Sequence, residues 1–234
     1  MKIPKKITPD HLKDTVVEVR FDTSVSLDLL AGMASSILKK AGFSYTPLNP
    51  NSSSESLNLN KATYLSGFFD RDLVKIQFVD NEIAFNCFAD KYPGWKNYSK
   101  TIKEILTLLV NEKAIDTFNR IAFRYISEFE NVDIFDNVRG NIDLKDTGIN
   151  LKNSILRLTK DIDNVKIFIT TANPINAKTG MPNSIVDINV FENLPKDAGI
   201  KILEEELDKI HLLQKETFFN FVSESFIQTL NPEY

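Results

Sequence analysis

Three strand-like segments joined by very short links constrain the fold of this chain more than any other feature. Residues 62–69, 73–79 and 82–88 have the alternation and composition of β-strands. The links between them consist of turn-forming residues, Asp70 to Asp72 and Asp80 with Asn81. A parallel connection would need a crossover of about a dozen residues. Links this short therefore predict an antiparallel meander.

Two amphipathic helices are predicted on either side of this meander. Residues 27–41 follow the capping residue Ser26 and end at Gly42. The apolar stripe of this helix consists of Leu29, Leu30, Met33, Ile37 and Leu38. Residues 95–111 form the second helix, whose stripe consists of Tyr98, Ile102, Ile105, Leu106 and Leu109. Because each helix has one apolar face, both are expected to pack on the sheet.

The order of elements is the same in the two halves of the sequence. The first half begins with a strand over 15–21, whose inner side chains are Val17, Val19 and Phe21. After its first helix comes a loop over 49–60 that is rich in Asn and Ser. In the second half we predict a strand, a helical turn, three strands and a terminal helix, over 118–126, 132–138, 152–159, 165–171, 184–191 and 197–230.

This repeated order predicts an internal duplication of a β-α-β-β-β-α unit, with halves 1–113 and 114–234 joined in one compact domain. The predicted fold is α+β, with a curved antiparallel sheet, helices on one face and a long C-terminal helix. In element order it resembles the TATA-binding-protein-like, or helix-grip, topology, in which a curved sheet wraps around a long helix. That resemblance carries no function by itself.

The terminal helix carries two apolar stripes. One stripe is expected to face the core and consists of Ile200, Leu203, Leu207, Ile210, Phe218 and Phe221. The other lies on nearly the opposite side and consists of Leu212, Phe219, Phe226 and Leu230. Because one core does not easily bury both, the second stripe is a candidate homodimer interface. The alternative is that it packs under the 173–183 loop or another helix of the same chain.

Composition limits the classes of partner. The 234 residues carry a net charge of -4, which argues against strong sequence-independent binding to nucleic acid. The basic N-terminal residues lack the apolar stretch of a signal peptide, and no apolar run is long enough to span a membrane. A cytoplasmic protein is therefore expected. The single cysteine, Cys87, lies in a buried-strand pattern and is expected to be an inert core thiol.

No catalytic residue, metal ligand or cofactor site is predicted. The glycines are scattered singly rather than clustered in a phosphate loop, and no nucleophile elbow occurs. The two histidines, His11 and His211, lack the spacing of metal ligands. Paired carboxylates such as Asp161 with Asp163 are explained by turns, and the 204–206 glutamates by the early turns of a helix.

Strand alternation does predict a candidate binding face. If the apolar residues face the helices, the opposite side of the sheet carries Arg20, Lys75, Gln77, Arg120, Arg124, Arg157 and Asn189, together with Asn86 and Asp187. Arginine forks suit carboxylates and phosphates, so a peptide, another anionic ligand or a nucleic acid would fit there. The alternative is a solvated face with cross-strand ion pairs, such as Glu18 with an arginine.

Four stretches, 12–21, 92–95, 120–126 and 218–230, resemble those of a sporadically distributed family of bacterial and archaeal proteins that carries no assigned activity. The resemblance implies a stand-alone protein, compatible with an accessory, defence or phage-related system. The predicted function is a non-enzymatic binding or interaction module. One alternative is an enzyme or small-ligand protein with a pocket between the sheet and the long helix. A weaker one is nucleic-acid binding on the basic sheet face.

Overall fold

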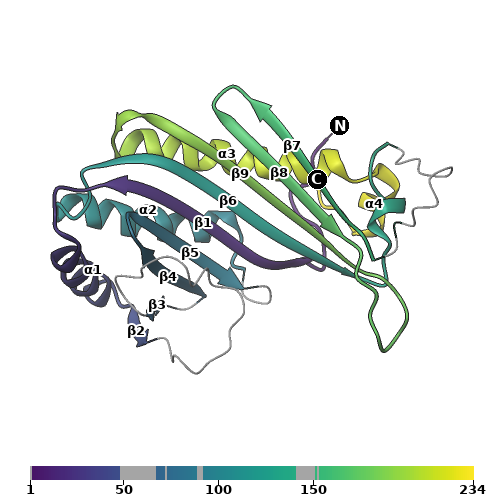
Figure 1. Cartoon of the computed structure of the whole chain (residues 1–234), viewed down its shortest axis with the longest axis horizontal. Coiled ribbons are helices and arrows are strands. Elements are labelled where there is room, and N and C mark those ends of the chain that lie inside the picture. The colour runs from purple at the N-terminus through teal and green to yellow at the C-terminus, as the bar shows by residue number, and fades with distance from the viewer. Residues whose placement is uncertain (1, 48–66, 72, 89–91, 141–150, 152) are drawn as a thin grey trace. The chain divides into compact units, whose positions relative to one another are not determined.

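The computed structural model describes residues 2–47, 67–71, 73–88, 92–140, 151 and 153–234. These residues form the predicted α+β fold (Figure 1). Its strands are β1 (Leu12–Asp22), β2 (Ser44–Pro47), β3 (Gly67–Arg71), β4 (Val74–Val79), β5 (Glu82–Phe88), β6 (Thr117–Glu130), β7 (Ile155–Ile162), β8 (Val165–Ala172) and β9 (Asn183–Ala198). Its helices are α1 (Leu27–Lys40), α2 (Trp95–Asn111), α3 (Ile200–Phe221) and α4 (Glu224–Thr229).

Within the described residues, nine strands form one antiparallel sheet in the order β2-β3-β4-β5-β1-β6-β9-β8-β7. The predicted meander is confirmed, because β3, β4 and β5 pair antiparallel. The order β1-β5-β4-β3 in one half matches β6-β9-β8-β7 in the other, as a duplication would require. The duplication itself stays a prediction.

Two details of the first half differ from the prediction. Asp70 and Arg71 belong to β3 instead of the following turn. The additional strand β2 pairs with β3, with Ser44 opposite Asp70 and Pro47 opposite Gly67. All four residues of β2 are exposed, so this strand has no apolar alternation to indicate it. The predicted loop at 49–60 lies outside the described residues.

The chain forms two compact units. Unit 1 consists of residues 1–15, 123–191 and 210–234, and unit 2 of residues 16–122 and 192–209. The long elements β1, β6, β9 and α3 each contribute residues to both. The unit boundaries thus differ from the predicted halves, 1–113 and 114–234, and that division remains a prediction.

In unit 2, the core lies between α2 and the apolar side of the strands. The whole predicted stripe of α2 is buried, and so are Val17, Val19, Phe21, Ile76, Phe78, Ile83, Phe85 and Cys87. In α1, the prediction for Leu29 is wrong, because its side chain is 57% exposed. The buried stripe of α1 is Leu30, Ala34, Ile37 and Leu38. These positions follow one another by one to four residues and make a narrower stripe than expected.

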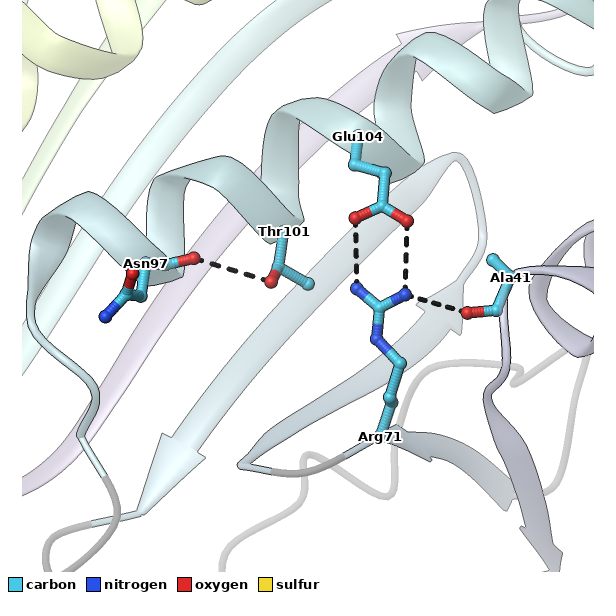
Figure 2. A network of polar contacts seen from close by, with 5 residues as sticks. All are labelled: Ala41, Arg71, Asn97, Thr101 and Glu104. Atoms are coloured by element: carbon cyan, nitrogen blue, oxygen red, sulfur yellow. Dashed lines mark hydrogen bonds and ion pairs between the residues drawn. The ribbon is translucent and has the colours of Figure 1, made fainter.

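Arg71 ties three elements of unit 2 together (Figure 2). Its Nη1 donates to the carbonyl of Ala41, the residue that ends α1, at 2.7 Å. Both terminal nitrogens also bond the Glu104 carboxylate of α2, each at 3.1 Å. Its guanidinium lies 4.5 Å from the ring centre of Phe43. One side chain of β3 therefore satisfies the end of α1 and holds α2.

The predicted long C-terminal helix is confirmed as α3, but its predicted extent over 197–230 is wrong, because a break after Phe221 separates α3 from α4. Ser223 caps α4 by accepting a hydrogen bond from the N–H of Phe226 at 3.2 Å. The carbonyls that end α3 bond the distant segment 137–139: the N–H of Arg139 donates to Phe221 O at 2.8 Å, and its Nε to Val222 O at 2.9 Å. Partners distant in sequence thus stop the helix.

This break explains the second apolar stripe. Phe219, Phe226 and Leu230 are 5%, 4% and 5% exposed, so they belong to the core of unit 1. The ring centre of Phe129 in β6 lies 5.3 Å from that of Phe226, edge to face, and 6.2 Å from that of Phe218. Only Leu212 of the predicted interface is exposed. The stripe packs within its own chain, so it does not form a free dimer surface.

The two ends of the chain lie side by side in unit 1 (Figure 1). The N–H of Lys5 donates to Glu233 O at 2.6 Å, and the N–H of Glu233 donates to Lys6 O at 2.8 Å. The N–H of Thr8 donates to Leu230 O at 3.0 Å. Among the described residues, no helix combines the length and apolar content that crossing a bilayer would require.

Candidate binding face on the sheet

The seven residues of the predicted binding face divide between the two units. Arg20, Lys75, Gln77 and Arg120 belong to unit 2, whereas Arg124, Arg157 and Asn189 belong to unit 1.

The register of β4 with β5 fixes the face that Lys75 occupies in unit 2. Lys75 is paired with Asn86 and Gln77 with Ala84, while the intervening pair of Ile76 and Phe85 is buried in the core. Because side chains alternate along a strand, Lys75 and Asn86 point away from that core. Gln77 is only 6% exposed on an interior strand, so it offers little surface to a ligand.

The ammonium group of Lys75 lies between two aromatic rings. It is 4.4 Å from the ring centre of Phe68 in β3 and 5.0 Å from that of Phe88 in β5. Both distances are within the range of cation–π attraction. The Phe88 side chain is 45% exposed, an unusual position for a large aromatic group. We call Phe68, Lys75 and Phe88 the lysine–phenylalanine patch.

Beside β5, Arg20 of unit 2 forms an ion pair with Glu82, and its charge also acts on Arg120. Arg20 of β1 donates from Nε to the Glu82 carboxylate at 2.7 Å. Burial lowers the pKa of Arg120 from its usual value, and the nearby Arg20 guanidinium lowers it further, while Glu18 and Glu82 oppose both effects. The geometry of Arg20 and Glu82 fits the alternative prediction of cross-strand ion pairs.

Arg124 makes a comparable contact in unit 1. Its Nε lies 3.1 and 3.2 Å from the two oxygens of Asp187, and Nη2 lies 2.8 Å from one of them. Asp14 is close enough to Arg124 and Asp187 for their charges to shift its pKa. Burial raises the pKa of Asp14, and Asp187 adds to this rise, whereas the Thr15 backbone hydrogen bond and the Arg124 charge lower it.

The other two predicted residues of unit 1, Arg157 and Asn189, differ in their exposure. Arg157 is exposed on β7. Asn189 is half-buried, and its side-chain oxygen is buried without a hydrogen-bond partner among the described residues. Arg157 is therefore open to a ligand, whereas Asn189 is only partly so.

Unit 1 also has an open pocket that the sequence did not predict. Its volume is about 280 Å³, and it is lined by Asp10, His11, Leu12, Lys13, Glu128 and Glu130. Lys13 pairs with Glu128 at 2.7 Å, and Asn183 Nδ2 donates to the same carboxylate at 2.6 Å. The Lys13 hydrogen bond, with help from Asn183, lowers the pKa of Glu128. The volume of this pocket is just below the usual range of ligand pockets, about 300–1,000 Å³.

Sequence reasoning missed Phe68 and Phe88 as surface residues. The signal was present, because both alternate with core residues: Phe69 is buried beside Phe68, and Cys87 beside Phe88. Within the described part of the chain, His, Cys, Asp and Glu side chains do not gather in threes that could hold a metal ion.

Comparisons with known proteins give no family for this chain. No family model matches the sequence. No curated protein matches it either. A solved structure titled "KH domains" aligns with 97% of this chain and 90% of its own at 7% identity, with a TM-score of 0.31. A TM-score this low carries no argument about fold or function.

Proposed function

We propose that this protein is a binding protein whose lysine–phenylalanine patch recognises an acidic peptide segment that also carries apolar side chains. The observation that carries the proposal is the position of the Lys75 ammonium between the rings of Phe68 and Phe88 on the side of the sheet opposite the unit 2 core. A role in an accessory, defence or phage-related system belongs to the same proposal.

The chemistry of the patch favours a carboxylate beside an apolar group. Aromatic rings on two sides remove part of the water around an ammonium ion, and less water strengthens its pairing with an anion. The exposed Phe88 ring supplies apolar surface next to that charge. Exposed aromatic side chains beside a charge are common at the centres of protein interfaces.

The surrounding charges favour a peptide over a nucleic acid. In the same unit, Arg20 already pairs with Glu82 at 2.7 Å, so its charge is partly neutralised. Nucleic-acid binding draws its affinity from several lysines or arginines that neutralise successive phosphates. The chain as a whole is also acidic, with a net charge of -4. A single lysine between two rings suits one or two carboxylates better.

Fluorescence anisotropy would test the proposal with a labelled peptide that alternates Glu with Leu and Phe. We expect this peptide to bind the wild-type chain, and the same peptide with Gln in place of Glu to bind at least about tenfold more weakly. Lys75→Glu and Phe88→Ser should each weaken binding by a similar factor. Lys100→Glu, at an exposed position of α2, makes the same charge change outside the patch and should leave binding unchanged.

Three results would contradict the proposal. One is equal binding of the Glu and Gln peptides. Another is an equal loss of binding in the Lys75→Glu and Lys100→Glu chains, which would indicate general electrostatic attraction. The last is tighter, salt-sensitive binding of a single-stranded DNA oligonucleotide, which would favour nucleic acid.

A further inference from the structure

Among the described residues, β7 is the outermost strand at one edge of the sheet, beside β8 (Figure 1). Its eight residues pair with β8 from Ile155 opposite Ala172 to Ile162 opposite Val165. Six of the eight are exposed, and Ile155 and Leu158 are 74% and 42% exposed. An edge strand of this length presents unpaired backbone donors and acceptors to another strand.

The other edge strand is built differently. Within the described part of the chain, β2 spans four residues, and its last described residue, Pro47, has no N–H to donate. Short length and proline are common ways to protect a sheet edge. β7 contains no proline, and apolar side chains are exposed on both of its faces, Ile155 on one and Leu158 on the other. Its sequence therefore leaves it open to pairing.

The charges along β7 are self-complementary in one antiparallel register. When Thr159 of one copy lies opposite Thr159 of another, Arg157 of each copy lies opposite Asp161 of the other. The same register places Leu156 opposite Ile162, and Leu158 opposite the aliphatic stem of Lys160. Directly opposite residues on one face interact, so opposite charges favour this pairing. In this register, odd-numbered residues lie opposite odd-numbered residues, and even-numbered residues lie opposite even-numbered ones. Because odd and even side chains lie on different faces of a strand, each face of one sheet continues into the same face of the other.

Neighbouring registers of the same kind are less favourable. Moving the centre to residue 157 places Arg157 opposite Arg157, and moving it to residue 160 places Lys160 opposite Lys160. Like charges directly opposite one another are destabilising. Centring on residue 158 avoids these repulsions but pairs Asp161 with Ile155 and Arg157 with Thr159. The register centred on Thr159 is thus the one that forms two opposite-charge pairs.

We propose that β7 is an interaction surface for a second copy of this chain, which pairs antiparallel about Thr159 and extends the sheet across the two copies. This contact is independent of the lysine–phenylalanine patch, which lies in unit 2. It also replaces the terminal-helix stripe as the basis for a homodimer.

Charge exchange tests the proposal with two matched variants. The first chain carries Arg157→Asp. The second carries Asp161→Arg with Lys166→Asp, because Lys166 lies opposite Asp161 within the hairpin and the pair then keeps opposite charges. In each variant alone, both inter-copy pairs have like charges. An equimolar mixture places the two carboxylates of the first chain opposite the two guanidinium groups of the second.

Light scattering and sedimentation over a concentration series would measure self-association. We expect the wild-type chain to dimerise, each variant alone to associate at least about tenfold more weakly, and the mixture to recover the wild-type constant as a heterodimer. Native mass spectrometry with one labelled chain identifies the heterodimer. Recovery in the mixture also shows that neither variant is misfolded.

The proposal is overturned by a wild-type chain that stays monomeric over the whole series. It is overturned equally by either variant alone dimerising as well as the wild type. A mixture that stays monomeric, while both variant chains show the circular dichroism spectrum of the wild type, would also overturn the proposal. Failure of the peptide experiment on Lys75 would leave this result unaffected, because the two experiments change different units.

Discussion

Tyr98 shows at the scale of one residue how α2 is fixed to the sheet of unit 2. Its side chain is fully buried, and its hydroxyl donates to the carbonyl of Phe85 at 2.6 Å. The burial of the Tyr98 ring could be predicted from the apolar stripe of the helix. The hydrogen bond could not, because its acceptor is a backbone oxygen of another element.

We expect Tyr98→Phe to lower the free energy of unfolding by about 1 kcal/mol, because it removes one buried hydrogen bond and leaves the ring in place. Urea unfolding would measure the change. Tyr45→Phe is the matched control, since Tyr45 is 36% exposed, and it should change stability by less than about 0.5 kcal/mol. An equal effect of both substitutions would contradict a specific role of the Tyr98 hydroxyl.

Asp14 gives a pH-dependent prediction. Because burial raises its folded-state pKa, the folded chain binds this proton more tightly than the unfolded chain. The resulting stability is present below the unfolded pKa of about 3.9 and is lost as the pH rises through the folded pKa. Asp14→Asn should therefore become more stable relative to wild type as the pH increases over this window.

Unfolding in urea at a series of pH values from acidic to neutral would measure the Asp14→Asn difference. The matched control is Asp163→Asn, the same substitution at an exposed position, measured over the same pH series. A difference between Asp14→Asn and wild type that stays constant with pH, or falls as the pH rises, would contradict the stated cause of the pKa shift.

At the scale of elements, local signals predicted well wherever the chain is buried on one side. The bounds of α2 were predicted as 95–111 and are Trp95–Asn111, because a continuous stripe follows Gly94. The break between α3 and α4 was missed, because the stripe continues through it and its hydrogen-bond partners lie at 137–139. β2 was missed because an exposed edge strand has no apolar pattern.

In the candidate site, too, local patterns could be predicted from the sequence, whereas contacts between distant segments could not. Alternation identified the face that carries Lys75 and Arg20. The pairing of Arg20 with Glu82 depends on the lateral register of β1 and β5, which alternation does not determine. The pocket beside Glu128 combines residues 10–13, at the start of β1, with the end of β6, two parts that no local pattern connects.

The contacts of Arg71 (Figure 2) give a prediction about element packing. We expect Arg71→Ala to cost about 2 kcal/mol, because it removes charge-assisted hydrogen bonds to α1 and α2. Arg71→Lys should recover less than half of this, since an ammonium group cannot reproduce the two-pronged contact with Glu104. Thermal and urea unfolding would measure both.

Lys100→Ala, at an exposed position of α2, serves as the control for Arg71 and should change stability by less than about 0.5 kcal/mol. Glu104→Gln should cause part of the Arg71→Ala loss. If Arg71→Lys were as stable as wild type, the planar geometry of the guanidinium would not matter.

At the scale of the whole molecule, neither unit is one continuous segment of chain. Unit 1 combines three segments, and Lys5 and Lys6 of its first segment are hydrogen-bonded to Glu233 of its last. The backbone hydrogen bonds that join Lys5 and Lys6 to Glu233 were not predicted, because nothing in either terminal sequence indicates a partner at the other end.

We expect deletion of residues 231–234 to lower the free energy of unfolding by about 2 kcal/mol, because it removes the backbone bonds of Glu233 and the Asn231 side-chain bond to Thr8 O. For a chain of this size the melting temperature should fall by about 4–8 °C. Calorimetry would measure it. Replacing residues 231–234 by Ala, which keeps the backbone bonds of residue 233, should cost less than the deletion.

The bonds between Lys5, Lys6 and Glu233 have a consequence for synthesis in the cell. During translation, Lys5 and Lys6 leave the ribosome long before their partner Glu233 has been added. Unit 1 therefore cannot complete its hydrogen bonding until residue 233 has also left the ribosome.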